Sequence, residues 1–368
     1  MVAPPNEPKR GWLRRHALAV LVLAVLTELL MRGLFLAYAT LAPPPDCGSV
    51  PATFARLFFA YSNGHYWRLS GNGMAVADAH RGHRSAPRLK GMLVAGAPVF
   101  TNDIGARADH DFAVPAPAGV TRIVALGDSM TYGEGVTNDA TWPAQLEARL
   151  SQTEVVNLGD RAYAHDQMYF ALADDGLRLA PDLVVLGFFE NDLSRDALVH
   201  YCYEKPRLAR DAAGWRLENV PVPGPAQLRT RYLSWPMLYA VPRALGEFWQ
   251  QPRPSERSGD ESGAENLNRI RKLAEASGAR FLLLNLPEHL DRPPSEKDFF
   301  ARHCALTKTE CIDTWASFQQ AAPGANREEL ERRFLRPHDI HYAREGYRVI
   351  AETLAQYLSE HPVVARPR

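Results

Sequence analysis

The sequence predicts a doubly wound α/β domain, in which helices cover both faces of a central parallel sheet of about five strands, preceded by one transmembrane helix. Three observations lead to this prediction. Short, continuously apolar runs alternate with helical stretches from residue 121 onward. Polar residues follow several of these runs, where a parallel sheet binds its ligands. An apolar stretch near the N-terminus has the length of about 20 residues that a helix needs to cross a bilayer.

The expected strands are short and rich in apolar residues, and the expected helices between them are amphipathic. In chain order the strands are RIVALGD, EVVNLG, PDLVVLGFF, RFLLLNLP and a weak CIDTW. The helices are TWPAQLEARL, with Pro143 in its first turn, HDQMYFALADDGLRL, AENLNRIRKLAEASG, which ends at Gly278, and AREGYRVIAETLAQYL. This alternation predicts that the strands run parallel.

We expect four segments along the chain. They are a basic tail and transmembrane signal anchor (1–40), a linker and N-terminal extension that packs on the main domain (41–120), the α/β domain (121–360) and a short tail (361–368). In the extension, the aromatic stretch FARLFFAYSNGHYWRL is expected to pack under the main domain, and AHRGHRSAPR to form a solvated basic loop.

An insertion at about 194–263 interrupts the α/β domain. Its end, QPRPSERSGDESGAE, is polar and rich in Pro, Gly and Ser, and we expect it to be a loop. Its middle, RYLSWPMLYAVPRALGEFW, is apolar. The middle could be a lid, a membrane-surface contact, a wall of the substrate site or a packed insertion without function.

The N-terminal apolar stretch, residues 17–38, contains Glu28 and Arg32. These two residues lie four apart, so on a helix they share a face and can pair. An uncleaved signal anchor is the favoured interpretation; a signal peptide cleaved near AYATLA and a buried soluble helix remain open. The basic residues before the stretch should stay in the cytoplasm, which places the rest of the chain on the extracytoplasmic side.

The composition indicates which partners, disulfides and metal sites to expect. The 42 basic and 42 acidic side chains balance, so nucleic acid is not an expected partner. Cys304 and Cys311 flank a short loop that a disulfide could close, and Cys47 and Cys202 could form a second. Four free thiols remain an alternative. The spacing does not fit a zinc site, and no metal or cofactor is expected.

Polar residues follow the strands at four places. Ser129 follows the first strand; Asn157, Gly159 and Ala162 follow the second; Asn191 and Asp192 follow the third; Asp339 and His341 precede the last helix. Since ligands bind beyond the carboxyl ends of the strands in doubly wound sheets, all four loops could meet at one edge.

The residues at these places resemble the four blocks of the SGNH (GDSL-type) serine hydrolases. GDSMTYGEGV is similar to the first block, VVNLGDRAYAHDQ to the second, FFENDLSRD to the third and HDIHYAREGY to the last. Upstream, VFTNDIGAR resembles a segment that often precedes the catalytic domain of membrane-anchored members. The resemblance covers roughly residues 121–360 and implies the flavodoxin-like SGNH hydrolase fold.

The sequence departs from the family pattern at three positions. Ala162 stands where the second block has glycine, Phe189 replaces the glycine of G-x-N-D, and His338 occupies the usual place of aspartate, three residues before the histidine. Asp339 lies only two residues before His341. A Ser–His dyad, with a backbone carbonyl orienting His341, therefore remains an alternative to a triad.

The resemblance implies roles for five residues. Ser129 would be the nucleophile, His341 the base and Asp339 its orienting carboxylate, while an oxyanion hole would form from the backbone N–H groups of Ser129 and Ala162 and the side chain of Asn191. The expected function is a membrane-tethered esterase on the periplasmic side of a bacterial inner membrane, acting on an ester-bearing small molecule, lipid or O-acetylated glycan.

Two alternatives remain open. The protein could be an O-acetyltransferase of polysaccharide assembly, in which a sugar hydroxyl replaces water as acyl acceptor. It could also be a catalytically weak binding or assembly factor that kept the fold. The sequence leaves the oligomeric state, the acyl chain and the disulfide pairing open.

Overall fold

The computed structural model describes residues 8–43, 45, 49–62, 73–250 and 256–366. The chain divides into two compact units. One, which we call the helical unit, comprises Met1–Leu69 and Pro225–Pro252; the other, the α/β unit, comprises Ser70–Gly224 and Arg253–Arg368. The expected insertion is thus divided, because residues 194–224 belong to the α/β unit and 225–252 to the helical unit.

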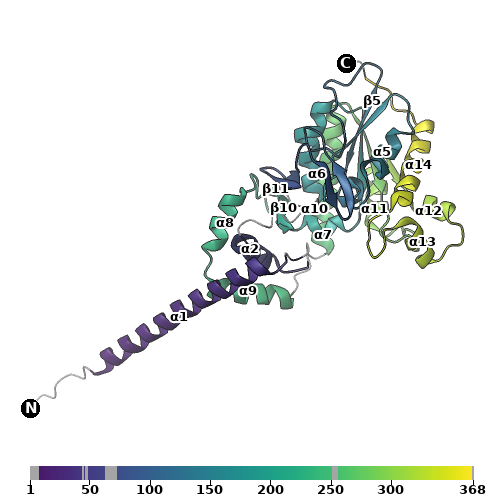
Figure 1. Ribbon diagram of the computed structural model, residues 1–368. Coiled ribbons are helices and arrows are strands. Elements are labelled where there is room, and N and C mark those ends of the chain that lie inside the picture. The colour runs from purple at the N-terminus through teal and green to yellow at the C-terminus, as the bar shows by residue number, and fades with distance from the viewer. Residues whose placement is uncertain (1–7, 44, 46–48, 63–72, 251–255, 367–368) are drawn as a thin grey trace, which may run out of the picture. The chain divides into compact units, whose positions relative to one another are not determined.

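The α/β unit is built on a five-stranded parallel sheet (Figure 1). Its strands are β5 (Thr121–Leu126), β6 (Thr153–Asn157), β7 (Leu183–Phe188), β12 (Arg280–Asn285) and β13 (Cys311–Asp313). They lie in the order β13-β12-β7-β5-β6, and every neighbouring pair is parallel. Counted along the chain this is the order 2-1-3-4-5, which is typical of flavodoxin-like folds. The predicted fold class is therefore confirmed.

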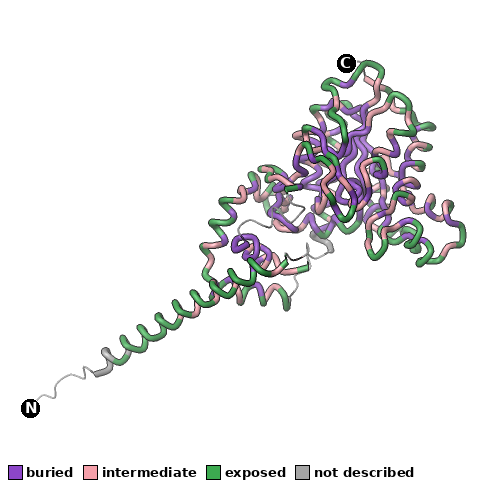
Figure 2. Tube along the Cα trace, viewed as in Figure 1, coloured by how far each residue is buried: buried purple, intermediate pink, exposed green. Residues whose placement is uncertain are grey.

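Helices cover both faces of this sheet because alternate strand residues point to opposite sides. Ile123, Ala125 and Val185 pack against α5 (Trp142–Glu147), α12 (Trp315–Ala321), α13 (Arg327–Phe334) and α14 (Arg344–Glu360). Val124, Leu126 and Val184 pack on the other side against α6 (His165–Ala171), α7 (Asp192–Asp196), α10 (Glu256–Ala276) and α11 (Phe299–Thr307). The sheet is consequently the most buried part of this unit (Figure 2).

Smaller elements surround the sheet. In the described part of the chain, two-stranded hairpins are formed by β1 (Ala75–Asp78) with β2 (Gly82–Ser85), β3 (Lys90–Val94) with β4 (Ala97–Phe100), β8 (His200–Tyr201) with β9 (Tyr203–Glu204), and β10 (Arg207–Asp211) with β11 (Gly214–Glu218). A short α4 (Ser129–Tyr132) follows β5, and single turns lie at Asn138–Ala140, Leu172–Gly176 and Leu177–Leu179. Cys304 and Cys311 form a disulfide. The expected pair Cys47–Cys202 involves Cys47, which lies outside the described residues.

The prediction of a loop at the end of the insertion is wrong from Glu256 onward, because the helix α10 begins at that residue. Its small residues allow close packing on α7: a Cβ at Gly263 would lie 2.4 Å from the Leu193 side chain. Leu267 and Ile270 of the same helix are buried against the sheet. Tertiary packing therefore stabilises a helix where glycine and serine predict a loop.

The basic run AHRGHRSAPR is not a solvated loop. It contains β2, and Arg81 and His83 are only 5% and 2% exposed. Arg81 donates hydrogen bonds to Asp78 and Asp175, 2.8 Å and 2.7 Å away. These carboxylates neutralise the charge and make burial of the guanidinium tolerable.

The helical unit contains α1 (Pro8–Leu41), α2 (Ala52–Tyr61), α8 (Pro225–Leu233) and α9 (Met237–Gln250). The first part of the aromatic stretch FARLFFAYSNGHYWRL lies in α2, which packs against α1, α8 and α9, and its residues 63–69 lie outside the described residues. Packing of this stretch on the main domain stays a prediction. Phe35 of α1 makes edge-to-face contacts with Phe54 and Tyr61 of α2. Within the described residues, Arg14–Leu41 of α1 is the only helical stretch long and apolar enough to cross a membrane.

Candidate active site

Ser129 lies where the strand order of the sheet reverses. It follows β5, whose neighbours are β6 on one side and β7 on the other. The connection from β5 leads to β6, whereas the later strands β7, β12 and β13 extend the sheet in the opposite direction. Loops diverge at such a switch point, and doubly wound folds bind their ligands there. Asn191 follows β7, so two of the expected site residues flank this point.

His341 links Ser129 to Asp339. The Nε2 atom of His341 lies 2.8 Å from Ser129 Oγ, and its Nδ1 atom lies 2.7 Å from Asp339 Oδ1. Ser129 is 7% exposed. The hydroxyl, imidazole and carboxylate thus form a continuous hydrogen-bonded chain with the geometry of a nucleophile, base and orienting acid.

The carboxylates around His341 favour its protonated form. Burial alone would lower the pKa of His341, but the hydrogen bond to Asp339 and the negative charge of Glu134 raise it above its ordinary value. Glu134 Oε2 lies 3.9 Å from His341 Nε2. Burial would raise the pKa of Asp339, but the hydrogen bond with His341 and the charge of Arg336 lower it to about 2. Asp339 is therefore ionised at neutral pH.

Arg336 holds Asp339 from the side opposite His341. Its Nη1 atom donates to Asp339 Oδ2 at 2.5 Å, and its Nη2 atom donates to the carbonyl of Ala95 at 2.7 Å. The guanidinium also covers Gly135, where a Cβ would lie 2.0 Å from Arg336 Cζ. Gly135 has a φ of +80°. The glycine thus permits both this backbone conformation and the close approach of the arginine.

The loop that carries Glu134 is fixed by Arg107, the last residue of VFTNDIGAR. Its guanidinium is buried and donates hydrogen bonds to the carbonyls of Tyr132, Gly133 and Val136. Its Nε atom donates to Asn138 Oδ1 at 3.0 Å. One side chain from the segment before the sheet therefore closes the turn that follows the expected nucleophile.

Asp128 and Asp192 are joined by Arg195. Asp128 Oδ1 accepts from the N–H of Met130 at 2.9 Å. Arg195 Nη1 donates to Asp128 Oδ2 at 3.1 Å and to Asp192 Oδ1 at 2.7 Å. Burial and the neighbouring Asp128 charge raise the pKa of Asp192 well above its usual range. The arginine ties the turn after β5 to the helix after β7.

The three expected oxyanion donors stand at the ends of three strands. Among the described residues, the backbone N–H groups of Ser129 and Ala162 donate to no other atom. Ala162 has a φ of +63°, the left-handed conformation that glycine would adopt without strain. Asn191 is exposed, and its Oδ1 atom accepts a long hydrogen bond from Ser194 Oγ at 3.4 Å. The Asn191 amide nitrogen thus remains able to donate to a substrate.

Sequence reasoning missed Glu134, Arg336 and the role of Arg107. Each stands within or beside one of the four family-like sequence blocks or the segment VFTNDIGAR, but spacing alone does not reveal which loops a side chain bridges.

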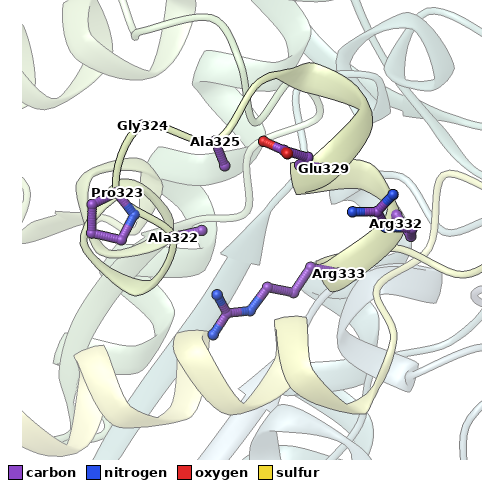
Figure 3. Close-up of a pocket in the computed structure, with 7 residues that line it drawn as sticks. All are labelled: Ala322, Pro323, Gly324, Ala325, Glu329, Arg332 and Arg333. Carbon is purple, nitrogen blue, oxygen red and sulfur yellow. The ribbon is translucent and has the colours of Figure 1, made fainter.

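A separate hollow of about 480 Å³ lies beside α13 and is lined by Ala322, Pro323, Gly324, Ala325, Glu329, Arg332 and Arg333 (Figure 3). None of the five expected site residues lines it.

No protein-family model and no curated protein matches the chain. Its fold is similar to that of a member of the lipolytic protein G-D-S-L family from Veillonella parvula, at 14% identity, with 65% of this chain and 99% of the other covered and a TM-score of 0.39. An α/β hydrolase, LAE5, from the metagenome of Lake Arreo has 15% identity, coverages of 68% and 99%, and a TM-score of 0.41. An acetylxylan esterase from Geobacillus stearothermophilus, solved as a catalytic mutant, has 14% identity, coverages of 67% and 97%, and a TM-score of 0.39.

Proposed function

We propose that the α/β unit is a serine esterase that hydrolyses carboxylic esters through an acyl-serine intermediate. The observation that carries this proposal is the hydrogen-bonded chain from Ser129 Oγ through His341 to Asp339. A serine hydroxyl is a weak nucleophile, and it attacks an ester only when a base removes its proton. His341 Nε2 is at hydrogen-bond distance from that hydroxyl.

The reaction then has two halves. Ser129 Oγ attacks the ester carbonyl carbon while His341 Nε2 takes the hydroxyl proton, and Asp339 stabilises the resulting imidazolium. The negative charge that develops on the carbonyl oxygen is stabilised by the N–H groups of Ser129 and Ala162 and by the Asn191 amide. Collapse of this tetrahedral species expels the alcohol, which receives the proton from His341. Water, activated by the same histidine, releases the acid and restores Ser129.

We further propose that α1 anchors the enzyme in a bacterial inner membrane, with the α/β unit on the periplasmic side. The apolar stretch Arg14–Leu41 supports this placement, as do the basic residues at its start, which favour the cytoplasm. A retained anchor is favoured over a cleaved signal peptide because Phe35 packs on α2. The Cys304–Cys311 disulfide is consistent with an oxidising compartment.

For an enzyme tethered on this side, the substrates within reach are envelope esters. We propose an O-acetylated glycan or a lipid ester as substrate class. In an acetyltransferase, a sugar hydroxyl would take the place of water in the second half of the reaction. Product analysis separates the two: hydrolysis yields free acetate with or without a glycan acceptor, and transfer yields acetylated acceptor.

The test is labelling of the full-length protein with a fluorophosphonate probe, together with hydrolysis of p-nitrophenyl acetate. We expect both to occur with the native chain and with Ser151→Ala, an exposed serine used as a matched control. We expect both to be abolished in Ser129→Ala. A folded native protein that neither reacts with the probe nor hydrolyses the ester would overturn the proposal and favour a binding or assembly factor.

A further inference from the structure

Helix α9 exposes an apolar stripe. Leu238, Pro242, Leu245 and Trp249 recur at the spacing that places residues on one helical face. Leu238, Leu245 and Trp249 are 45%, 55% and 81% exposed. A helix on the surface of a water-soluble protein normally presents polar residues outward. On α9, apolar residues face outward instead, and such an exposed apolar surface needs an apolar partner.

The opposite side of α9 is fixed within the helical unit by polar contacts. Glu247 accepts hydrogen bonds from the backbone N–H and the hydroxyl of Thr53, at 2.9 Å and 2.7 Å, at the start of α2. Arg243 donates to Glu247 at 2.9 Å. Ala240 and Ala244 are buried. Because these contacts set the rotation of α9, the apolar stripe cannot turn inward.

The first turn of α9 is tied to α1. The Glu28 carboxylate accepts hydrogen bonds from the backbone N–H groups of Met237 and Leu238, at 2.8 Å and 3.0 Å. Arg32 pairs with Glu28 at 2.7 Å and donates to the carbonyls of Leu233 and Trp235, each at 2.8 Å. The two charged residues of the apolar stretch thus satisfy backbone groups of the α8–α9 connection, which explains how they are accommodated there.

The position of Glu28 along α1 determines how deep in the bilayer the contact between α1 and α9 lies. At 1.5 Å per residue, Glu28 lies about 20 Å along the helix from Arg15, at the basic end of the span. The hydrocarbon layer of a bilayer is about 30 Å thick. If Arg15 marks the cytoplasmic surface, the start of α9 lies in the outer half of the bilayer.

We infer that α9 is embedded in the outer leaflet of the membrane that α1 crosses, with its apolar stripe against phospholipid acyl chains. The inference rests on the membrane anchor of the proposed function and does not depend on the esterase chemistry. The protein is then held by one spanning helix and by a second helix that enters only one leaflet, as amphipathic interfacial helices do. Trp249 suits such a site, because tryptophan is enriched near membrane interfaces.

The test is spin labelling of the full-length protein in nanodiscs of phosphatidylethanolamine and phosphatidylglycerol. A nitroxide is attached at Leu245→Cys, and its collision rates with oxygen, which partitions into lipid, and with an aqueous nickel chelate are measured. Among the described residues there is no free cysteine, so within them only the new thiol is labelled. Leu23→Cys in α1 serves as the lipid reference and Arg216→Cys in β11 as the aqueous reference, since both side chains are exposed.

We expect the label at Leu245 to collide more often with oxygen than with the nickel chelate, as at Leu23. Lipid-like values at Leu23 with aqueous values at Leu245 would overturn the inference and leave the anchor intact. Aqueous values at both would overturn the anchor as well. Spin–spin broadening at Leu245 that persists when the labelled protein is diluted with lipid would overturn the inference, because it would show that the apolar stripe packs against a second copy of the chain. Thermal unfolding of each labelled variant verifies that it is folded.

Discussion

Asp339 accepts a hydrogen bond from Nδ1 of His341 at 2.7 Å, although only Ile340 separates the two residues in the sequence. The expected spacing of three residues is therefore not required for contact. Asp339→Asn should lower kcat/KM for p-nitrophenyl acetate by about 10²- to 10⁴-fold, because the imidazolium loses its stabilising charge. Asp211→Asn, at an exposed hairpin carboxylate, is the matched control. Full activity of Asp339→Asn would indicate a Ser–His dyad oriented by another group.

Glu134 is expected to set the pH range of activity. The base must be neutral to take a proton, so the rate rises with pH through the pKa of His341. Burial lowers that pKa, while Asp339 and Glu134 raise it above its ordinary value. Glu134→Gln removes one of the raising charges, so the acid limb of the kcat/KM profile should move to lower pH. Glu296→Gln, at an exposed position, should leave the profile unchanged. An unmoved acid limb in Glu134→Gln would contradict this role.

Ala162→Gly should stabilise the protein and preserve activity. A left-handed conformation costs a non-glycine residue about 1–2 kcal/mol, and glycine costs about 0.5–1 kcal/mol in lost chain entropy. The net gain in unfolding free energy is about 0.5–1 kcal/mol, measurable by denaturant unfolding. Ala164→Gly is the contrasting control, since Ala164 has a φ of −113° and is buried, so glycine there should destabilise. Loss of hydrolysis in Ala162→Gly would mean that more than its N–H is needed.

Asn191→Ala should leave a folded enzyme with kcat reduced by about 10²- to 10³-fold, the usual effect of removing one oxyanion donor. Ser194→Ala provides the control, because Ser194 Oγ contacts both the carbonyl and the side-chain oxygen of Asn191. That variant should retain most of its activity. Equal losses in the two variants would attribute the effect to the shape of the loop and remove Asn191 from the oxyanion hole.

Arg107→Met should lower the free energy of unfolding by at least about 3 kcal/mol, because three buried carbonyls lose their donor. Thermal or denaturant unfolding measures this change. Arg88→Met, at a side chain that is 63% exposed, should be nearly neutral. A small effect at Arg107 would show that water or a neighbouring group replaces the guanidinium.

The sequence was sufficient to predict the sheet because its strands are buried on both faces. Val184, Val185 and Leu186, for example, are inaccessible to solvent and form part of a continuous apolar run. A continuous apolar run of this kind indicates a strand that is buried on both faces. The positions of Ser129 and Asn191 soon after strands, and of His341 just before the last helix, follow from the same pattern.

Features that depend on distant partners could not be predicted in this way. Arg81 is buried because Asp78 and Asp175 surround it, and the start of α10 is helical because Gly263 packs on Leu193. In both cases the local composition indicates a solvent-exposed loop, but contacts with residues distant in the sequence produce a buried or helical segment. Glu134 stood in a quoted block, but its approach to His341 depends on how two loops fold together.

The hydrogen bond from Arg336 to the carbonyl of Ala95 bears on where the protein can be shortened. A version beginning at residue 121 keeps Ser129 and His341 but loses the acceptor of Arg336, together with Arg107. Ser85, whose N–H donates to Asp160 at 2.5 Å, is lost as well. The segment between β1 and β5 is therefore not a dispensable leader, and a shortened form that keeps these contacts should start ahead of β1, at the boundary near Ser70.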